Sequence, residues 1–349
     1  MIFLASDNWA GAHPKIAAGL SHHAAGFAEA YGASRLDRAV AERFNAIFER
    51  EVAVFFVATG TAANALALTA GARPGGVAFA HREAHVLEDE CGASEYLSGG
   101  CRVQPIDGDL GRIDPARLRH VLARLGTDNF HAGQPTAVTV TQATEAGTVY
   151  PLAAIAEIGE IARSHGLLFH MDGARFANAL VALEATPAEM TWKRGVDIMS
   201  FGGTKNGCWC AEAVVLFDPG RARDFGFLRK RAAQLFSKSR FVAAQFEAYF
   251  ADGLWLELAA HANAMAGRLA GRIAASNALR LAWQPEANEV FAVMNRELFG
   301  RLKREAIFYP WAIPHASAGE IGPDETLCRL VTSFATTAAD IDGFAALFR

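Results

Sequence analysis

The chain has 349 residues, of which 52% are hydrophobic, and its formal net charge at pH 7 is −4. This length and apolar content can fill a large core and favour about two domains. Charges of both signs are scattered along the chain without a basic block, so we expect neither nucleic acid nor a membrane as a partner. No run of roughly 18 apolar residues predicts a membrane-spanning helix.

The five cysteines lack the spacing of a disulfide framework, and their odd number favours a reducing compartment. The apolar run of residues 2–5 is too short for the core of a signal peptide. We therefore expect a cytoplasmic protein. Cys208 and Cys210 are too closely spaced for the usual zinc pairs, so we interpret them as packing residues and expect no metal site.

Two helices are predicted near the N-terminus. Pro14 can open a short helix, and Ser34 with Asp37 three residues later is typical of a helix start. The second helix carries an apolar stripe at helical spacing, formed by Leu36, Val40, Phe44 and Phe48.

The next segment predicts a turn that can bind an anion. Residues 52–57 form an apolar run that we expect to be a fully buried strand, and this strand leads through the Gly/Thr-containing segment of residues 58–64 into an alanine-rich helix. Backbone N–H groups and the helix dipole attract negative charge at such a helix start. An ordinary turn capped by threonine is the alternative interpretation.

Strands and helices alternate through the middle of the chain, which is typical of an α/β protein. We expect strands at residues 77–80, 137–141, 167–172, 196–201 and 213–217. Helices are predicted from Pro115 onward, after a capping Asp114, and at residues 152–164.

The pattern changes from about residue 250. A long helical region is predicted at residues 241–277, followed by a strand at 289–293, a helix at 297–305 and a strand at 327–332. We therefore expect an N-terminal arm (1–12), a large domain (13–250) and a small C-terminal α/β domain (251–349). Arg329 lies inside the last strand, where an arginine needs a partner, and a buried ion pair is one interpretation.

Two polar residues follow buried strands in the middle of the chain. Asp172 ends the run "LLFHMD", and Lys205 follows "IMSFGGT". Partial loss of hydration lowers the pKa of a lysine in a cleft and makes its amine a usable nucleophile, although a solvated loop lysine is the common case. Together, such a lysine and aspartate are what pyridoxal phosphate chemistry requires: the lysine forms a Schiff base, and the aspartate keeps the ring nitrogen protonated.

With "HMDGARFANA" and "SFGGTKNG" both present, the chain resembles the threonine aldolases among the pyridoxal phosphate enzymes of the aspartate-aminotransferase-like fold, fold type I. It is most similar to the branch of low-specificity L-threonine aldolase and phenylserine aldolase, along nearly its whole length. The resemblance implies pyridoxal 5'-phosphate as cofactor and a mostly parallel seven-stranded sheet in the large domain. It also implies a homodimer or homotetramer with shared active sites.

The resemblance implies roles for cofactor-binding residues. Gly60 and Thr61 match the Gly-Thr pair that binds the cofactor phosphate. His85, at the start of "HVLEDECGA", matches a histidine that stacks on the cofactor ring and is a candidate base. Cations of the segment 229–240 reach the phosphate in the family, and we favour Lys230 or Arg231.

Further residues are implied around the substrate. Ser6 of "SDN" matches a serine that helps bind the substrate carboxylate, and Arg329 of "RLVT" matches an arginine that clamps it with two parallel hydrogen bonds. Arg175, in the same motif as Asp172, is expected in the cofactor site. Glu90 matches a family glutamate near the site, and a structural carboxylate is an equally good interpretation.

One departure from the family pattern concerns the substrate hydroxyl. Many threonine aldolases carry "ENTH" near residues 142–148, where this chain reads "QATEAGT" without a histidine. The base for the hydroxyl proton is therefore open. His85, a water held by Thr144 or Glu145, and the cofactor phosphate are the candidates.

The implied reaction is reversible cleavage of L-threonine, allo-threonine or another β-hydroxy-α-amino acid, such as phenylserine, to glycine and an aldehyde. Another pyridoxal phosphate enzyme, a β-eliminating lyase or an aminotransferase acting on a small amino acid, is the first alternative. A regulatory or binding protein that has lost the chemistry is the second. The joint presence of Asp172, Arg175 and Lys205 argues against it.

Overall fold

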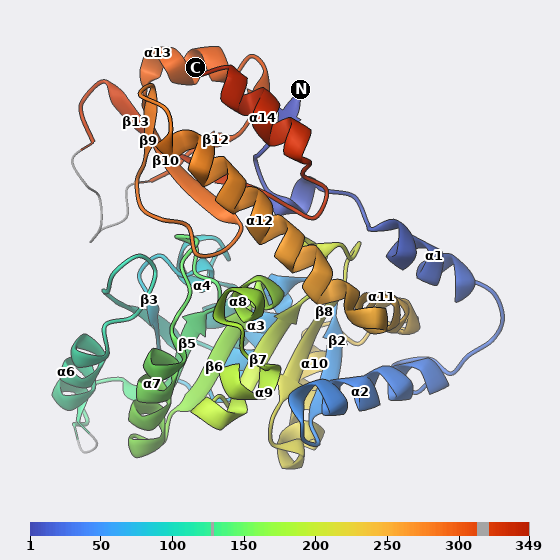
Figure 1. Cartoon of the computed structure of the whole chain (residues 1–349). Helices are drawn as coiled ribbons and strands as arrows, with labels where there is room; N and C mark the ends of the chain where they lie inside the picture. Colours follow the sequence, from blue (N-terminus) through green and yellow to red (C-terminus); the bar gives the residue numbers. More distant parts are fainter. Residues whose placement is uncertain (127–128, 313–320, 349) are drawn as a thin grey trace.

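The computed structural model describes residues 1–126, 129–312 and 321–348. In Figure 1, a large sheet flanked by helices forms the lower part of the molecule, and a smaller group of C-terminal strands and helices lies above it. Helix α12 (Leu254–Ala274) runs diagonally from one part to the other, and both termini lie in the upper part.

The large sheet has seven strands, and β8 alone runs against the others, because it pairs antiparallel with both of its neighbours. The expectation of a mostly parallel seven-stranded sheet is therefore confirmed. In spatial order the strands are β2 (Ala53–Val57), β8 (Glu212–Leu216), β7 (Ile198–Gly202), β6 (Leu168–Gly173), β5 (Gln134–Thr141), β3 (Gly76–His81) and β4 (Arg102–Ile106).

The prediction that residues 52–57 form a fully buried strand is wrong. Strand β2 lies at the edge of the sheet, and its first three residues are only half-buried. An edge strand has a neighbouring strand on one side only, so an apolar run does not by itself tell an edge strand from a central one.

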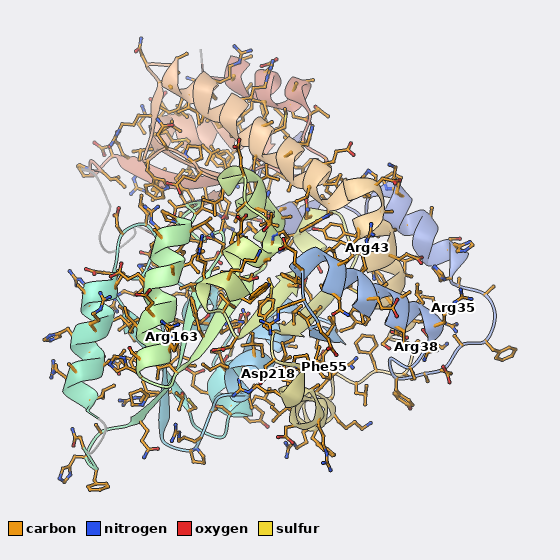
Figure 2. The ribbon with its side chains drawn as sticks, turned by 60° about the horizontal axis from the view of Figure 1, so that its bottom comes forward. Arg35, Arg38, Arg43, Phe55, Arg163 and Asp218 are labelled. Atoms are coloured by element: carbon orange, nitrogen blue, oxygen red, sulfur yellow. The ribbon has the colours of Figure 1, made fainter. Side chains whose placement is uncertain are left out.

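Helices cover both faces of this sheet, and several begin where the sequence predicts. Ser34 and Asp37 form a reciprocal capping box at the start of α2, and Figure 2 shows Arg35, Arg38 and Arg43 along the outside of this helix. The helices around the sheet include α1 (Pro14–His22), α2 (Arg35–Phe48), α3 (Gly60–Thr69), α6 (Pro115–Leu125), α7 (Leu152–Ser164), α8 (Phe176–Leu183), α10 (Ala222–Arg231) and α11 (Arg240–Phe250).

The C-terminal part has its own antiparallel sheet and its own apolar cluster. The N-terminal arm joins it, because β1 (Ile2–Phe3) pairs with β11 (Ala306–Ile307) and Leu4 is buried in that cluster. Its other elements are β9 (Leu279–Leu281), β10 (Glu289–Asn295), β12 (Tyr309–Pro310), β13 (Glu325–Val331), α13 (Arg296–Leu302) and α14 (Ala338–Ala346).

The predicted helical region 241–277 is interrupted. Between α11 and α12, Asp252 (φ 53°) and Gly253 (φ 72°) adopt left-handed backbone conformations that end one helix before the next begins. This break lies where the sequence places the domain boundary, which itself stays a prediction. Within the described part of the chain, none of the helices has the length and apolarity needed to cross a membrane.

The direction of the strands determines where polar side chains gather. β2, β5, β6 and β7 end at one edge of the sheet, and β8, which runs the other way, starts there: Glu212 is paired with Val57 and with Gly202. In open α/β sheets, ligands bind outside the carboxyl ends of the strands. This edge is therefore where a site is expected.

Candidate active site

A cavity of about 280 Å³ opens at this edge of the sheet. It is lined by five of the predicted site residues, Gly60, Thr61, His85, Asp172 and Lys205. The other lining residues are Asn8, Ala58, Thr59, Asn64, Ala174, Thr204 and Glu212.

The start of α3 forms one wall of the cavity. Thr59 caps this ten-residue helix, with its side-chain oxygen accepting a hydrogen bond from the Ala62 backbone N–H at 3.1 Å. Gly60 follows the cap, and a Cβ atom at that position would lie 3.9 Å from a carboxylate oxygen of Glu212. The helix start therefore presents backbone N–H groups and the positive end of its dipole to the cavity.

Asp172 is held by a buried hydrogen-bond chain that reaches His85. One carboxylate oxygen of Asp172 accepts from Ala174 N at 3.0 Å, and the other accepts from Asn64 Nδ2 at 2.9 Å. The same Asn64 nitrogen donates to Glu90 Oε1 at 2.8 Å, and that oxygen lies 2.8 Å from His85 Nδ1. Asp172, Asn64, Glu90 and His85 thus form one connected network.

This network changes the pKa of His85. The hydrogen bond to Glu90 raises the pKa of the imidazole above its usual value, against the opposing effect of partial burial. Burial raises the pKa of the Glu90 carboxyl, and the hydrogen bonds from His85 and Asn64 oppose that rise. The sequence indicated Glu90 but not Asn64, whose only signal is a polar residue in an alanine-rich helix.

Lys205 lies in the short helical turn η3 (Thr204–Asn206), just after β7. A glycine stands on each side of this turn, at a position where a side chain is disfavoured. A Cβ atom on Gly203 would lie 3.0 Å from the carbonyl oxygen of Ala211, and Gly207 has a φ of 104°. These constraints fix the backbone that carries the lysine at the cavity.

Glu212 is a lining residue that the sequence analysis missed. Its carboxylate is buried, and Oε1 accepts a hydrogen bond from Thr204 N at 3.4 Å. Burial raises the pKa of Glu212 to about 7, against the lowering effects of Thr204 and Lys205. In the sequence, the sign that could have indicated Glu212 is its position as an acidic residue at the start of an otherwise apolar strand.

Arg175 and Arg329 lie beside the cavity rather than in its lining. Arg175 forms two hydrogen bonds with Asp7, at 2.8 and 3.1 Å. Arg329 pairs with Glu289 at 3.4 Å and stacks on Trp311, with the guanidinium carbon 3.9 Å from the ring centroid. Asp7 precedes the lining residue Asn8 and Arg175 follows the lining residue Ala174, which brings this cluster to the edge of the cavity.

The remaining predicted residues have different positions. Ser6 caps the turn at Asp7–Trp9, and its hydroxyl accepts from Asn8 N at 3.2 Å. Lys230 and Arg231 are exposed at the end of α10 and do not line the cavity, and the Lys230 ammonium lies over the Tyr31 ring. From this segment it is Gln234 that reaches the cavity wall, by accepting a hydrogen bond from Ala58 N at 3.0 Å.

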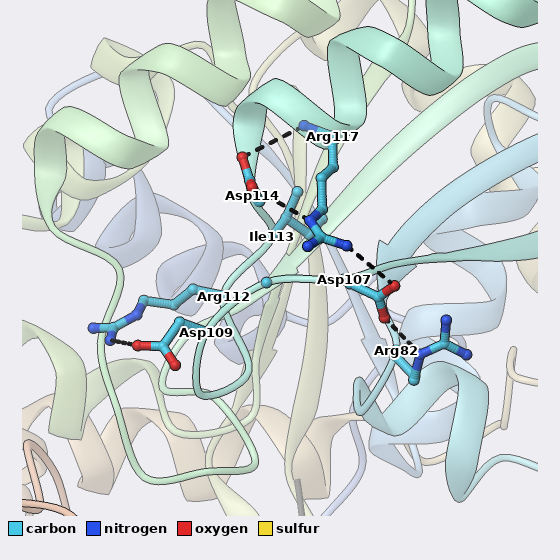
Figure 3. Close-up of a pocket in the computed structure, with 8 residues that line it drawn as sticks. Arg82, Asp107, Asp109, Arg112, Ile113, Asp114 and Arg117 are labelled. Carbon is cyan, nitrogen blue, oxygen red and sulfur yellow. Dashed lines mark hydrogen bonds and ion pairs between the residues drawn. The ribbon is translucent and has the colours of Figure 1, made fainter. Parts of the chain in front are cut away.

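A larger hollow of about 690 Å³ lies elsewhere on the surface and is lined mostly by charged residues (Figure 3). Its arginines and aspartates pair with one another, as in Arg82 with Asp107 at 2.6 Å and Arg117 with Asp114 at 3.5 Å. Because these charges already neutralise each other, we favour the smaller cavity as the site. Among the described residues, no cluster of three or more potential ligands is arranged for a metal ion.

Comparisons with known proteins identify the family of the chain. Residues 4–297 match the family model of the β-eliminating lyases. The chain is 40% identical to a low specificity L-threonine aldolase of Pseudomonas sp. (strain NCIMB 10558) over 301 residues, 86% of each chain. It is also similar to the structure of threonine aldolase from Leishmania major, with 26% identity, a TM-score of 0.92 and coverage of 100% of this chain and 98% of that one.

A shorter match, 32% identical over 155 residues, is to alanine racemase TOXG of Cochliobolus carbonum and covers 43% of this chain and 38% of that protein. The fold is that of a fold type I pyridoxal phosphate enzyme. The chain belongs to the β-eliminating lyase family, within the group that includes the low specificity L-threonine aldolases. The predicted family is confirmed.

Members of this family depend on pyridoxal phosphate, and the residues of this cavity fit that group. Asn64 Oδ1 and Glu90 Oε2 are buried without a hydrogen-bond partner among the described residues, which leaves polar capacity beside the cavity. The start of α3 suits a phosphate, Asp172 suits a protonated ring nitrogen, and Lys205 supplies an amine.

We expect His85→Asn to keep cofactor bound but to lower kcat by about 10²–10⁴-fold, if His85 accepts the hydroxyl proton. The base is active when neutral, so the activity that depends on it is lost as pH falls through the raised pKa of His85. The kcat profile of the variant should lack this acid limb. Loss of cofactor with normal turnover of the remaining loaded enzyme would restrict His85 to stacking.

Glu90→Gln tests whether the same acid limb of the kcat profile belongs to His85. Replacing the carboxylate that hydrogen-bonds to His85 lowers the pKa of the imidazole, so the acid limb should move to lower pH. An unchanged limb would assign it to another group, such as Glu212.

Proposed function

We propose that the protein catalyses the reversible cleavage of L-threonine, allo-threonine and other β-hydroxy-α-amino acids to glycine and an aldehyde. The observation that carries the proposal is the placement of Asp172 and Lys205 around one cavity with the start of α3. The 40% identity to a low specificity L-threonine aldolase supports the choice of substrate.

The cofactor would be held by residues from three strand ends. Gly60 and Thr61 would bind its phosphate at the positive end of α3, Lys205 would attach it covalently, and Asp172 would face its ring nitrogen. Pyridoxal phosphate supplies an electron sink that allows the Cα–Cβ bond of an amino acid to break. Asn64 keeps the Asp172 carboxylate oriented.

The substrate would be held by a second set of residues. Arg329 would bind its α-carboxylate, with Ser6 near the same position, and would fix the orientation of the bond that breaks. His85, which has an ionisable nitrogen in the cavity wall, would accept the proton of the β-hydroxyl group.

The test is a product assay on purified protein supplied with pyridoxal phosphate. Incubation with L-threonine should yield equal amounts of glycine and acetaldehyde, and phenylserine, which we also propose as a substrate, should yield benzaldehyde. A keto acid with ammonia instead would favour a β-eliminating lyase, which the family description suggests as the second candidate. Amino transfer would give a keto acid without free ammonia.

We expect Arg329→Leu to raise the KM for L-threonine strongly while cofactor binding is retained. Loss of one partner of a sheltered charged pair costs about 2–5 kcal/mol. Arg280→Leu is a suitable control, because Arg280 is an exposed arginine of β9 paired with Glu325. An unchanged KM with a lower melting temperature would leave Arg329 only its structural ion pair with Glu289.

We further propose a homodimer or homotetramer in which active sites are shared between subunits. Phe27 and Tyr31 are large apolar side chains exposed near α1 and α2, which is typical of an interaction surface. Lys230 and Arg231 are exposed close by, where a second subunit could use them at its own phosphate site. Light scattering of the purified protein measures the oligomeric state, and a monomer would contradict the proposal.

We also propose that the protein works in the cytoplasm. All five cysteines are free thiols, including the exposed Cys91, which suits a reducing compartment. Cell fractionation with an antibody against the protein tests this location, and recovery in an extracellular fraction would contradict it.

A further inference from the structure

A buried cluster of two arginines and two carboxylates lies beside the cavity. Asp7, Arg175 and Glu289 have side chains that are 1%, 3% and 0% exposed, and Arg329 is 15% exposed. Arg175 joins both carboxylates, because its other ion pair, from Nη2 to Glu289 Oε1, measures 3.3 Å. The cluster connects the short helical turn η1 (Asp7–Trp9), the loop after β6, and the strands β10 and β13.

The cluster has unused hydrogen-bonding capacity around Glu289. A single carboxylate oxygen, Oε1, contacts both Arg175 at 3.3 Å and Arg329 at 3.4 Å. Glu289 Oε2, Arg175 Nη1 and Arg329 Nε are buried and have no hydrogen-bond partner among the described residues. Buried polar atoms are rarely left unpaired in this number, so the cluster is arranged for a further polar group.

The charges of the cluster also limit what can bind. Asp7 and Glu289 balance Arg175 and Arg329, so a substrate carboxylate adds a negative charge for which these four residues hold no further cation. The charged groups that face Glu289 are Asp7, Arg175, Arg329 and Glu145. Burial raises the pKa of Glu289, helped by Glu145 and Asp7 and opposed by the two arginines.

We propose that Glu289 is a positioning residue that holds Arg175 and Arg329 in the free enzyme and releases Arg329 to the substrate carboxylate by taking up one proton. The inference rests on the proposed function, in which Arg329 binds an α-carboxylate. The step is a simple protonation: the Glu289 carboxylate and one proton from solvent give a neutral carboxyl group, and the substrate carboxylate replaces it as the partner of Arg329.

After this exchange, both arginines still have a carboxylate partner. A neutral Glu289 can still accept a hydrogen bond from Arg175, whose main partner is Asp7. Arg329, which has no other carboxylate partner among the described residues, becomes available to a ligand. The charges of Asp7, Glu289, Arg175 and Arg329 cancel before binding, and with Glu289 neutral the other three cancel with the substrate carboxylate.

The test is isothermal titration of the holoenzyme with 3-hydroxybutyrate at pH 8, in two buffers that differ in ionisation enthalpy. This probe carries a carboxylate and a β-hydroxyl group but no amine, so imine formation contributes no protons. We expect the wild type to take up close to one proton per bound ligand and Glu289→Gln to take up none. The affinity of the wild type should fall with rising pH, by up to tenfold per unit, while that of the variant should stay constant.

Two further variants test whether another group takes up the proton when the ligand binds. His85, which also titrates near the ligand, and Glu145, which faces Glu289, are the competing acceptors. Proton uptake should persist in Glu145→Gln and in His85→Asn. Uptake that survives in Glu289→Gln, or that is absent from the wild type, overturns the proposal. If Glu289→Gln does not fold, loss of uptake in either of the other two variants overturns it.

The same preparations separate this inference from the proposed function. A wild-type enzyme that cleaves L-threonine but takes up no proton retains the proposed function and contradicts the role of Glu289. A wild-type holoenzyme that binds no 3-hydroxybutyrate at any pH overturns the carboxylate clamp on which the inference rests.

Discussion

Lys205→Ala is expected to abolish turnover, with a loss on the order of 10⁴-fold or more, as when a covalent enzyme loses its nucleophile. Lys205 is the one lysine that lines the cavity in the described part of the chain. Among the described residues, no second lysine lines the cavity that could take its place. The variant should also lose the visible absorption of covalently bound cofactor.

Borohydride reduction of the wild-type holoenzyme, followed by peptide mapping, identifies the attached lysine directly. A cofactor label on Lys205 is the expected result, and a label on another lysine contradicts the assignment. Lys193→Ala is a matched control, because that side chain forms a partly exposed ion pair with Glu49 at 2.7 Å. The control should retain both absorption and activity.

The residues that the sequence could identify are those whose signal is local. Asp172 and Lys205 each follow an apolar run, and parallel strands deliver such residues to one edge of a sheet. The start of α2 was readable for the same reason, since its capping box needs only Ser34 and Asp37. The mostly parallel order of the sheet came from the family resemblance rather than from the pattern.

The residues that the sequence analysis missed depend on contacts between distant segments. Asn64 has a role only because Asp172 and Glu90, 108 and 26 residues away, lie within hydrogen-bond distance of its amide. Glu212 and Glu289 begin strands that otherwise look apolar, and nothing nearby in the sequence indicates that their carboxylates are buried. The half-buried edge strand β2 was misjudged for the same reason.

Arg329 shows that two interpretations of one residue can both apply. An arginine within an apolar strand needs a partner, and the structure provides Glu289. A carboxylate clamp needs the same guanidinium group to be available. If Glu289 titrates on binding, the ion pair belongs to the free enzyme and the clamp to the complex, so neither interpretation excludes the other.

The second large effect on catalysis is expected when Asp172 is replaced. Asp172→Asn should lower kcat by about 10²–10³-fold, the range for removing one preorganised electrostatic contact, because a neutral amide no longer favours a protonated ring nitrogen. The variant should still fold. The amide oxygen of the variant residue can still accept from Asn64 Nδ2, which leaves the hydrogen bond of that nitrogen to Glu90 in place, while the hydrogen bond from Ala174 N is lost.

Two measurements separate a chemical role of Asp172 from a structural one. The free energy of unfolding of Asp172→Asn, measured by thermal unfolding, should fall by no more than about 1–3 kcal/mol, the cost of the one lost hydrogen bond from Ala174 N, while kcat falls. Asp197→Asn is the matched control: its carboxylate accepts from Phe169 N at 2.8 Å at the opposite end of the neighbouring strand. That variant should lose stability and keep kcat. Wild-type kcat in Asp172→Asn would mean that this carboxylate serves the hydrogen-bond network alone, and the proposed partner of the ring nitrogen would have to be sought elsewhere in the cavity.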